Sequence, residues 1–397
     1  MENKFKEFSA NESNPKWENM IKRENIIYKR QNELRSEFER DYTRIIHCNA
    51  YRRLKHKTQV FFSPESDHIC TRLEHVMHVE SISYTIARYL GLNTELTKAI
   101  ATAHDIGHSP FGHEGEKILS NISKNEIGET FWHEKNGLDY VEKIELLEDL
   151  IKDKQNLNLT YAVRDGIISH CGEIDENMLK PREENINLDE YKTPNQYAPY
   201  TWEGCVVKIA DKIAYLGRDI EDAISLGILD ENLEELYNIL QSKQVINNTV
   251  IINQLIQDIC MNSTPEKGLC FSEDMFNLIK EIKQFNYKYI YLSDRIKPAR
   301  RYFYLVINEI FKTLKSAYDG ENTIDKFEKM KKIYPDVFEG FEKWLSNYWN
   351  FKRDISYKND IIFNIEDEKD FSRAIIYYIA GMTDNFAINE YNKIIGF

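Results

Sequence analysis

The chain has 397 residues, 65 of them acidic and 52 basic, which gives a formal net charge of -13. This length suffices for a sizeable core in one large domain or two smaller ones. The negative charge disfavours general coating of nucleic acid, so any phosphate ligand must meet locally concentrated cations or a metal. The six scattered cysteines form no C-x-x-C pair and suit free thiols in a reducing cytosol, so we expect a cytoplasmic protein.

The N-terminal segment is polar rather than a signal peptide, and no apolar run approaches the roughly 20 residues of a membrane-spanning helix. Nearly every patterned stretch after it repeats at helical spacing, which predicts an all-α fold without a membrane role. We divide the chain into a polar arm at 1–27, a helical body at 28–320 and a C-terminal helical extension at 321–397.

Two helices stand out in this pattern. Residues 71–90 carry one apolar face, and Gly91 ends that helix. Thr94 can cap a second helix that breaks near Gly107, so the pair His104-Asp105 should fall on its last turn. Further helices are expected near 28–55, 113–120, 134–152, 160–170, 203–227, 231–241, 246–260, 273–284, 299–318, 335–350 and 368–380.

Two stretches predict long polar connections. Residues 172–200 contain three prolines within a run of Glu, Asp and Asn, and residues 119–132 form a second polar segment. Either segment could cover a cleft.

His75, the pair His104-Asp105 and the distant Asp211 have the composition of a divalent-metal site. Antiparallel packing of the first two helices could bring the first three residues together. Asp211 is flanked by apolar residues, so its carboxylate would be buried and would need a cation. Two imidazoles and two carboxylates leave positions for water and a phosphate oxygen, as a Lewis-acid hydrolase requires.

The simpler interpretation of each residue is structural, because a lone helical histidine is usually a core or surface group. The distribution of the histidines argues against it here: all ten lie within 47–170, and seven of them lie within 68–133. The polar, glycine-punctuated turn at 106–116 is also more than packing requires. Histidines that we interpret as structural or surface residues are His47, His56, His68 and His170.

Four segments around these residues resemble the deoxyguanosine triphosphate triphosphohydrolase (dGTPase) family of HD-domain phosphohydrolases. They are RIIHCNAYRRLKHKTQVF at 44–61, TRLEHVMHV at 71–79, HDIGHSPFGHEGE at 104–116 and ADKIAYLGRDIEDA at 210–223. More distantly they resemble the animal dNTP hydrolase that joins a SAM domain to an HD domain. The likeness covers about 28–225, and beyond it only YFYLVINEIFKTL at 302–314 looks similar. The resemblance implies an HD-type helical bundle.

The resemblance also implies roles for residues around the metal set. His113 and Glu116 match a catalytic pair, and His133 matches an imidazole that works alongside it. Residues that match phosphate-binding positions are Arg72, His108 and Lys212. Tyr215 would close the space that a 2′-hydroxyl needs, and Asp219 would accept a hydrogen bond from the 3′-hydroxyl. Gln59 and Val60 match positions that touch the base or sugar.

The activity implied by the resemblance is metal-dependent hydrolysis of a dNTP, with dGTP favoured, to deoxynucleoside and tripolyphosphate. Mn²⁺ or Mg²⁺ is the expected ion, and Fe²⁺, Ni²⁺, Co²⁺ or Zn²⁺ also suits these ligands. Expected partners are the dNTP, further copies of the chain in a homo-oligomer (a tetramer or hexamer), and a nucleotide effector or single-stranded DNA.

Two other classes of function stay open. An HD-type phosphodiesterase or nucleotidase on mono- or cyclic nucleotides would keep the metal set but would not need Arg72 and Lys212 to hold a triphosphate. A nucleic-acid-binding protein with an HD shell would need a basic patch such as RRLKHK at 52–57, which we interpret as a solvated helix face.

Overall fold

The computed structural model groups the chain into two compact units. Residues that it describes are 3–25, 33–62, 68–149, 152–170, 177–230, 232–240, 247–349 and 351–396. Unit 1 comprises Met1–Ile45, Ser63–His104 and Leu159–Pro298, and unit 2 comprises Ile46–Phe62, Asp105–Asn158 and Ala299–Phe397. The units alternate along the chain, so their boundaries differ from those of the expected segments 28–320 and 321–397. Those segments stay a prediction.

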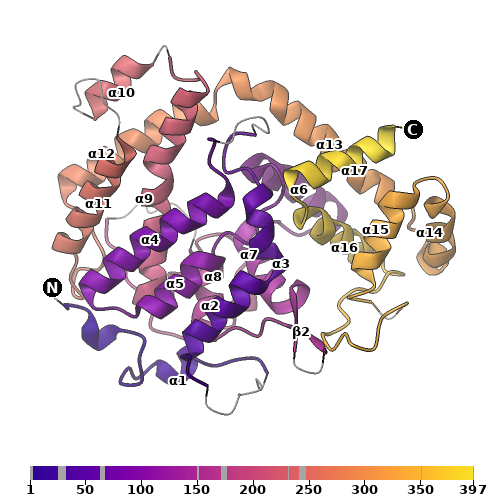
Figure 1. Cartoon of the computed structure of the whole chain (residues 1–397), viewed down its shortest axis with the longest axis horizontal. Helices are drawn as coiled ribbons and strands as arrows, with labels where there is room; N and C mark the ends of the chain where they lie inside the picture. Colours follow the sequence, from indigo (N-terminus) through magenta and orange to yellow (C-terminus); the bar gives the residue numbers. More distant parts are fainter. Residues whose placement is uncertain are drawn as a thin grey trace. The chain divides into compact units, whose positions relative to one another are not determined.

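Within the described ranges the regular secondary structure is helical apart from one two-stranded sheet, which confirms the all-α class (Figure 1). Those ranges contain no helix with the length and apolar content that a bilayer crossing requires. All the described cysteines are buried free thiols, and Cys171 lies outside the described residues.

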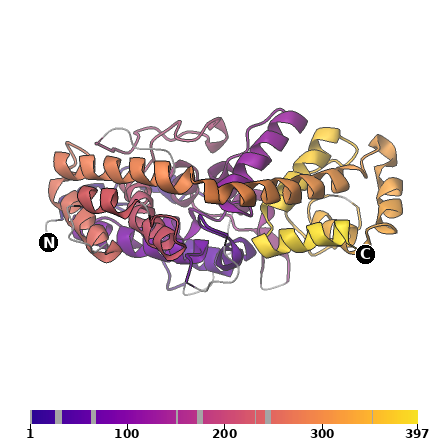
Figure 2. The same cartoon turned by 90° about the horizontal axis from the view of Figure 1, so that it is seen from above.

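Unit 1 is an assembly of helices joined by short turns. Its helices are α1 (Trp17–Met20), α2 (Glu37–His47, whose last two residues belong to unit 2), α4 (Arg72–Leu90), α5 (Thr94–Ala103), α8 (Tyr161–Ser169), α9 (Trp202–Ser225), α10 (Leu233–Ile239), α11 (Asn248–Asn262) and α12 (Glu273–Asn286). Its single helical turns are η1 (Lys6–Phe8), η4 (Leu188–Glu190), η5 (Tyr287–Tyr291) and η6 (Asp294–Ile296). α4, α5 and α9 pack against one another, and α8 packs on α5 and α9. Both α11 and α12 also pack on α9, and α10 packs on α12. These helices are labelled in Figure 1, and Figure 2 gives the view from above.

The boundaries of α4 follow from its end residues. Thr71 and Glu74 form a reciprocal capping box, in which each side chain accepts a hydrogen bond from the other residue's backbone N–H. Gly91 ends the helix with φ of 84°, a left-handed conformation that glycine adopts without strain. The helix expected at 71–90 is therefore confirmed.

The expected end of the second helix needs correction. Asn93, rather than Thr94, caps α5, because its side-chain oxygen accepts from the backbone N–H groups of Glu95 and Leu96. The helix ends at Ala103, so His104 is its C-cap and Asp105 begins the following turn. The pair thus lies just past the last helical turn instead of within it.

Unit 2 combines helices with the one small sheet. Its helices are α3 (Asn49–Arg53), α6 (Gly112–Glu126), α7 (His133–Asp139), α13 (Lys297–Lys315, whose first two residues belong to unit 1), α14 (Thr323–Lys331), α15 (Pro335–Leu345), α16 (Glu368–Ala380) and α17 (Asp384–Ile395). Its helical turns are η2 (Leu54–His56), η3 (Tyr140–Ile144) and η7 (Gly320–Asn322). Strands β1 (Leu146–Glu148) and β2 (Lys154–Asn156) pair antiparallel, with Leu147 opposite Gln155.

Several other expectations are wrong in detail. The helix expected at 134–152 ends in a wide helical turn at Ile144, and the chain then enters the β1–β2 hairpin. The polar connection expected at 119–132 is helical up to Glu126, because its polar residues form the outer face of α6. The helix expected at 28–55 breaks into α2 and α3, and its first residues lie outside the described ones. α14 and α17 were not expected. The described part of the 172–200 connection, 177–200, contains only the turn η4.

Candidate metal centre

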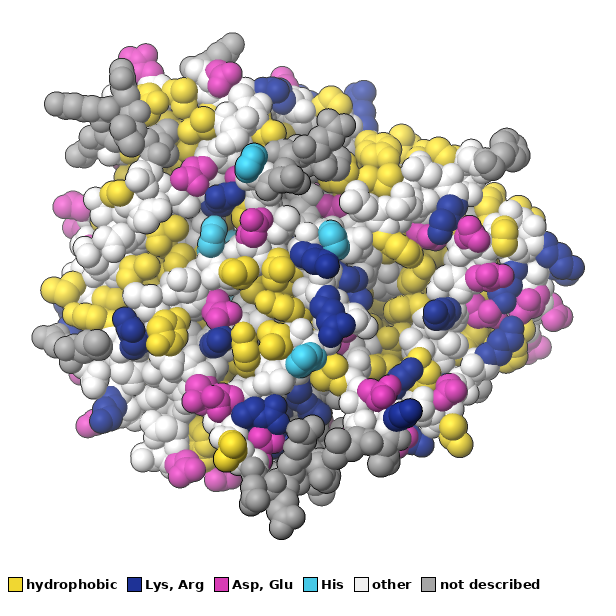
Figure 3. Space-filling model, in the orientation of Figure 1, with side chains coloured by type: hydrophobic (Ala, Val, Ile, Leu, Met, Phe, Trp, Pro, Cys, Tyr) yellow, Lys and Arg dark blue, Asp and Glu magenta, His cyan; other side chains and the backbone are white. Residues whose placement is uncertain are grey.

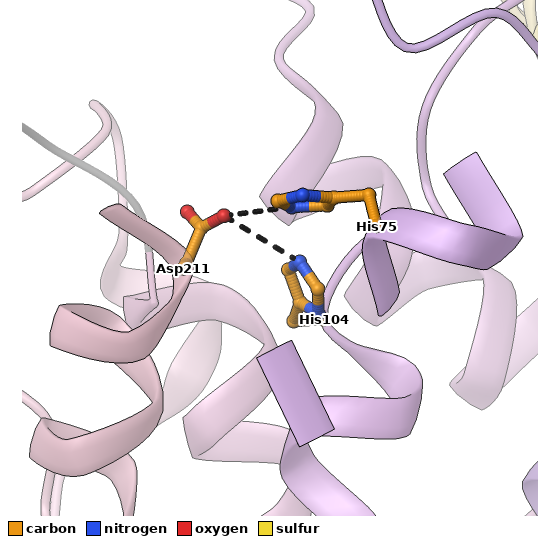
Figure 4. A group of neighbouring side chains, drawn as sticks. All are labelled: His75, His104 and Asp211. Carbon is orange, nitrogen blue, oxygen red and sulfur yellow. Dashed lines mark hydrogen bonds and ion pairs between the residues drawn. The ribbon is translucent and has the colours of Figure 1, made fainter. Parts of the chain in front are cut away.

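Three of the four expected metal ligands meet inside unit 1. His75 lies on α4, His104 follows α5, and Asp211 lies on α9, the three helices that pack together. Asp211 Oδ1 lies 2.9 Å from His75 Nε2 and 3.8 Å from His104 Nε2. Figure 4 shows the carboxylate turned toward both imidazole rings. The potential ligand atoms of the three residues lie within 4.8 Å of one another, a spacing that one cation can bridge.

The electrostatics of this trio keep Asp211 ionised. Burial raises the pKa of the Asp211 carboxyl, but the hydrogen bond with His75 and the nearby imidazoles of His104 and His170 outweigh burial and hold that pKa below its ordinary value. An ionised carboxylate beside two imidazoles is a donor set for a divalent cation.

The backbone fixes the ring of His104 for metal binding. His104 Nδ1 lies 2.7 Å from the carbonyl oxygen of Ala101, so Nδ1 carries the proton and Nε2 presents its lone pair. This arrangement, in which one ring nitrogen is held by a carbonyl group, is how proteins orient metal-ligating histidines. The residues present therefore fit a divalent ion.

The fourth expected ligand, Asp105, follows His104 directly in the chain but is grouped with unit 2. Within that unit its Oδ1 lies 3.0 Å from His108 Nε2. The division between the two units thus falls on the peptide bond of the His-Asp pair.

His170 was interpreted as structural or surface, and the structure places it beside the trio. It is 1% exposed at the C-terminal end of α8, and its ring centroid lies 5.0 Å from that of His104. Its Nδ1 lies 2.7 Å from the carbonyl oxygen of Ile167, three residues earlier, as Ala101 is three residues before His104. Both His104 and His170 directly follow a helix that ends in small or apolar residues, and this shared pattern is the signal that the sequence contains.

The expected catalytic residues of unit 2 form a second cluster. His133 Nδ1 lies 3.0 Å from Glu116 Oε2, and His113 Nδ1 lies 3.6 Å from the same oxygen. The His108 and His133 rings stack with centroids 3.7 Å apart, whereas the His113 side chain is 62% exposed. Glu116 is therefore held more closely by His133 than by His113, its expected partner.

Glu116 remains a carboxylate in this cluster. Burial raises its pKa, but the charge of His133 and the hydrogen bonds from His113 and His133 together hold that pKa well below the ordinary value. A group of imidazoles with one ionised carboxylate can hold a proton and pass it on.

Two glycines allow close backbone contacts in the turn before α6 and in the first turn of α6. A Cβ at Gly107 would lie 2.1 Å from the carbonyl oxygen of His133, and one at Gly115 would lie 1.8 Å from that of Pro110. Phe111, between them, has φ of 62°. Only residues without a side chain allow the backbone to pass this close, which explains the glycine-punctuated pattern at 106–116.

Two residues that hold this turn were not anticipated from the sequence. Asp384 of α17 accepts hydrogen bonds from the backbone N–H groups of Phe111 and Thr58, both at 2.8 Å. Buried Lys57 donates to the carbonyl oxygens of His108 and Ala380. Both contacts join segments far apart in the chain, so no local pattern predicts them.

The expected phosphate and sugar residues of unit 1 lie on the same helices as the metal ligands. Arg72 begins α4 and is buried, and Lys212 follows Asp211 on α9. Lys212 and Tyr215 line a cavity of about 650 Å³ in unit 1. Asp219 is buried and accepts a hydrogen bond from the hydroxyl of Tyr291, which also lines the cavity. Tyr291 was not anticipated from the sequence.

The two remaining expected contacts, Gln59 and Val60, lie in unit 2 after η2, where Gln59 is buried and Val60 half-buried. Their contact with a base or sugar stays a prediction.

Comparison with known proteins agrees with this donor set. Residues 72–216 match the HD domain family, and residues 343–393 match the phosphohydrolase-associated domain. The chain is 34% identical over 365 residues to the deoxyguanosinetriphosphate triphosphohydrolase-like protein of Caldanaerobacter subterraneus, covering 91% of this chain and 86% of that protein. It is 33% identical over 380 residues to the protein of the same name from Rickettsia bellii, covering 91% and 92%.

We expect both Asp211→Asn and His104→Ala to lower the affinity for Mn²⁺ by more than roughly tenfold. Loss of a residue that only hydrogen-bonds to a metal ligand already has an effect on that scale, and these variants alter the ligands themselves. Titration calorimetry with the purified variants measures it. The exposed His47, replaced by alanine, is the matched control and should bind Mn²⁺ as the wild type does. Wild-type affinity in both site variants would rule out the assignment.

Proposed function

We propose that the substrate is a deoxynucleoside triphosphate, because the chain belongs to the family of the deoxyguanosinetriphosphate triphosphohydrolase-like proteins. Its HD domain makes it a metal-dependent phosphohydrolase. The products would be the deoxynucleoside and intact tripolyphosphate. dGTP is the favoured substrate, since it is the nucleotide in the printed name of these relatives.

The observation that carries this proposal is the composition of α9. Within unit 1 this helix carries the expected metal ligand Asp211 next to Lys212 and four residues before Tyr215, and both Lys212 and Tyr215 line the 650 Å³ cavity. That volume lies in the range of sites for small ligands. Lys280 and Lys283 also line it, so the cavity offers aromatic surface for a nucleoside and cations for phosphates.

The chain's own residues supply most of the chemistry we propose. A divalent ion, when bound, polarises a phosphoryl oxygen and lowers the pKa of its water. The guanidinium of Arg72 and the ammonium of Lys212 would neutralise the triphosphate. His113 would exchange a proton with the attacking water or the leaving 5′-oxygen, while Glu116 and His133 hold the imidazole group in place, with His108 contacting phosphate.

The remaining features of the proposal concern the ion and the partners. We propose Mn²⁺ or Mg²⁺ as the ion, with Fe²⁺, Ni²⁺, Co²⁺ and Zn²⁺ as substitutes that suit imidazole and carboxylate ligands. We also propose a cytoplasmic homo-oligomer, a tetramer or hexamer. Tyr304 and Leu305, more than half exposed on α13, supply apolar surface for its contacts. A nucleotide effector and single-stranded DNA stay predicted partners.

A nucleic-acid-binding role would use the basic strip at 52–57. Some of its residues are paired or buried, and others are exposed to solvent. Arg53 pairs with Glu145 at 2.7 Å, and Lys57 is buried on two carbonyl groups, so the expectation of a solvated face is wrong for these two residues. Arg52 and Lys55 are exposed. On the face drawn in Figure 3, basic side chains are interspersed with acidic and hydrophobic ones. These observations favour the enzyme.

Product analysis tests the proposal. Each dNTP is incubated with the protein and Mn²⁺ or Mg²⁺, and the products are separated by anion exchange. We expect deoxynucleoside and tripolyphosphate in equal amounts. Orthophosphate released from a monophosphate, or an opened cyclic nucleotide with no action on dNTPs, would instead assign the chain to the nucleotidase or phosphodiesterase class.

Replacing His113 by alanine should reduce kcat by about a hundredfold, the usual scale for loss of a proton-transfer group. Because the side chain is exposed and lies outside the metal trio, Mn²⁺ binding and the melting temperature should be unchanged. Steady-state kinetics and calorimetry measure both. A raised KM with unchanged kcat would make His113 a binding residue.

Tyr215→Ala should narrow the preference for dGTP over GTP. In the wild type the ring would crowd a 2′-hydroxyl or bury it unpaired, at a cost of about 1–3 kcal/mol, which gives a preference of roughly tenfold or more. The ratio of kcat/KM for the two substrates measures the effect, with Mn²⁺ affinity as the control for site integrity. An unaltered ratio would remove Tyr215 from the sugar pocket.

A further inference from the structure

The C-terminal part of unit 2 is connected at two points to the turn that precedes α6. Asp384, the first residue of α17, is 3% exposed, and its carboxylate accepts the backbone N–H of Phe111 at 2.8 Å. Buried Lys57 donates to the carbonyl oxygen of His108 and to that of Ala380, the last residue of α16. Both Ala380 and Asp384 lie in the stretch that matches the phosphohydrolase-associated domain. That stretch therefore supports both ends of the turn, one directly and one through Lys57.

The backbone of this turn needs support from outside. Phe111 has φ of 62° and ψ of 26°, a left-handed conformation that costs energy for a residue with a side chain. It is the N-cap of α6, but an aromatic ring cannot accept the hydrogen bonds of the first helical N–H groups. The ring stacks instead on Phe303 of α13, with centroids 4.3 Å apart, while Asp384 holds the backbone N–H. Contacts from other elements thus set the direction in which α6 begins.

The carboxylate of Asp384 suits this position better than an amide of the same size. Its Oδ1 accepts the N–H of Phe111, and its Oδ2 accepts the N–H of Thr58, both at 2.8 Å. An asparagine would offer one acceptor oxygen and would turn its NH₂ group against the other N–H. The side chain therefore ties two separate backbone segments to the start of α17.

The residue that depends on this turn is His113, the second residue of α6. Its side chain is 62% exposed, so the position of the imidazole depends chiefly on the helix start that carries it. A displacement of about 1 Å in a reacting group can lower a rate by a factor of roughly a hundred. The start of α6 is therefore a sensitive point for any proton transfer by His113.

We propose that Asp384 is a positioning residue, which holds the start of α6 so that His113 can exchange a proton with the substrate. The inference rests on the proposed function, because that function gives His113 its role. Asp384 acts through the backbone of Phe111 and is not itself a reacting group. The phosphohydrolase-associated stretch would thereby take part in turnover.

Asp384→Asn, which keeps the size but removes one acceptor, should lower kcat for dGTP with Mn²⁺ at least tenfold. The KM for dGTP and the affinity for Mn²⁺ should stay within twofold of the wild type. In the His113→Ala background the same substitution should change kcat less than twofold, because two residues that act through one group are not additive. A further tenfold fall in that background, or a rise in KM without a fall in kcat, would overturn the inference.

Thr383→Ala is the matched control for stability. Thr383 caps the same helix by accepting the N–H of Phe386 at 3.3 Å, and its replacement leaves Asp384 in place. The melting temperature should fall while kcat keeps its wild-type value, with the assays run at a temperature at which every variant is folded. An equal loss of kcat in Thr383→Ala and Asp384→Asn would reduce Asp384 to a stabilising role and overturn the inference.

Histidine NMR tests the positioning without turnover. In protein labelled with ¹³C-histidine, the His113 signal is assigned by its loss in His113→Ala. Asp384→Asn should shift that signal, and Thr383→Ala should not. An unmoved signal in Asp384→Asn would overturn the inference. If the wild type hydrolyses no dNTP, the proposed function itself is at fault, and the NMR comparison alone then decides whether Asp384 positions His113.

Discussion

The contact of the Asp211 carboxylate with the imidazoles of His75 and His104 is the interaction around which unit 1 is arranged. The residues come from three helices whose other contacts are largely apolar, so a charged cluster sits within a hydrophobic core. Burial of such a cluster costs desolvation energy, which the hydrogen bond with His75 and the nearby imidazoles outweigh for the Asp211 carboxylate. A divalent cation would balance the carboxylate and use the imidazole lone pairs, so the cluster is a candidate binding site.

The same arrangement relates the candidate metal centre to the cavity of unit 1. One turn of α9 after Asp211, the helix turns Tyr215 toward the cavity, and α12 packs on α9 and brings Asn286 against Leu216. The candidate metal centre and the cavity therefore share α9, which would limit how far a ligand in the cavity could move relative to the expected metal ligands. Sites built on helices are more exact than sites built on loops for this reason.

How much of the fold and of the site could be predicted depends on whether a feature is determined by neighbouring residues or by contacts between distant segments. The helix at 71–90 carries its own start and stop signals in Thr71, Glu74 and Gly91, and it forms as expected. His75, His104 and Asp211 were expected to be metal ligands because a histidine, a His-Asp pair and an aspartate in apolar surroundings have few structural uses, and the structure brings these three residues together. Asp384 and Lys57 act through contacts between distant segments, and no periodicity or spacing reveals those. His170 was missed because a single histidine has no partner in sequence, although its backbone contact repeats that of His104.

The alternation of the two units along the chain has a consequence for how this protein can be divided. The backbone passes between the units after Ile45, Phe62, His104, Asn158 and Pro298. The stretch that matches the HD domain, 72–216, takes parts of both units, and so no single cut of the gene yields either unit whole. A single cut between His75 and Asp211 would leave these two residues on separate fragments, and each fragment would carry parts of both units.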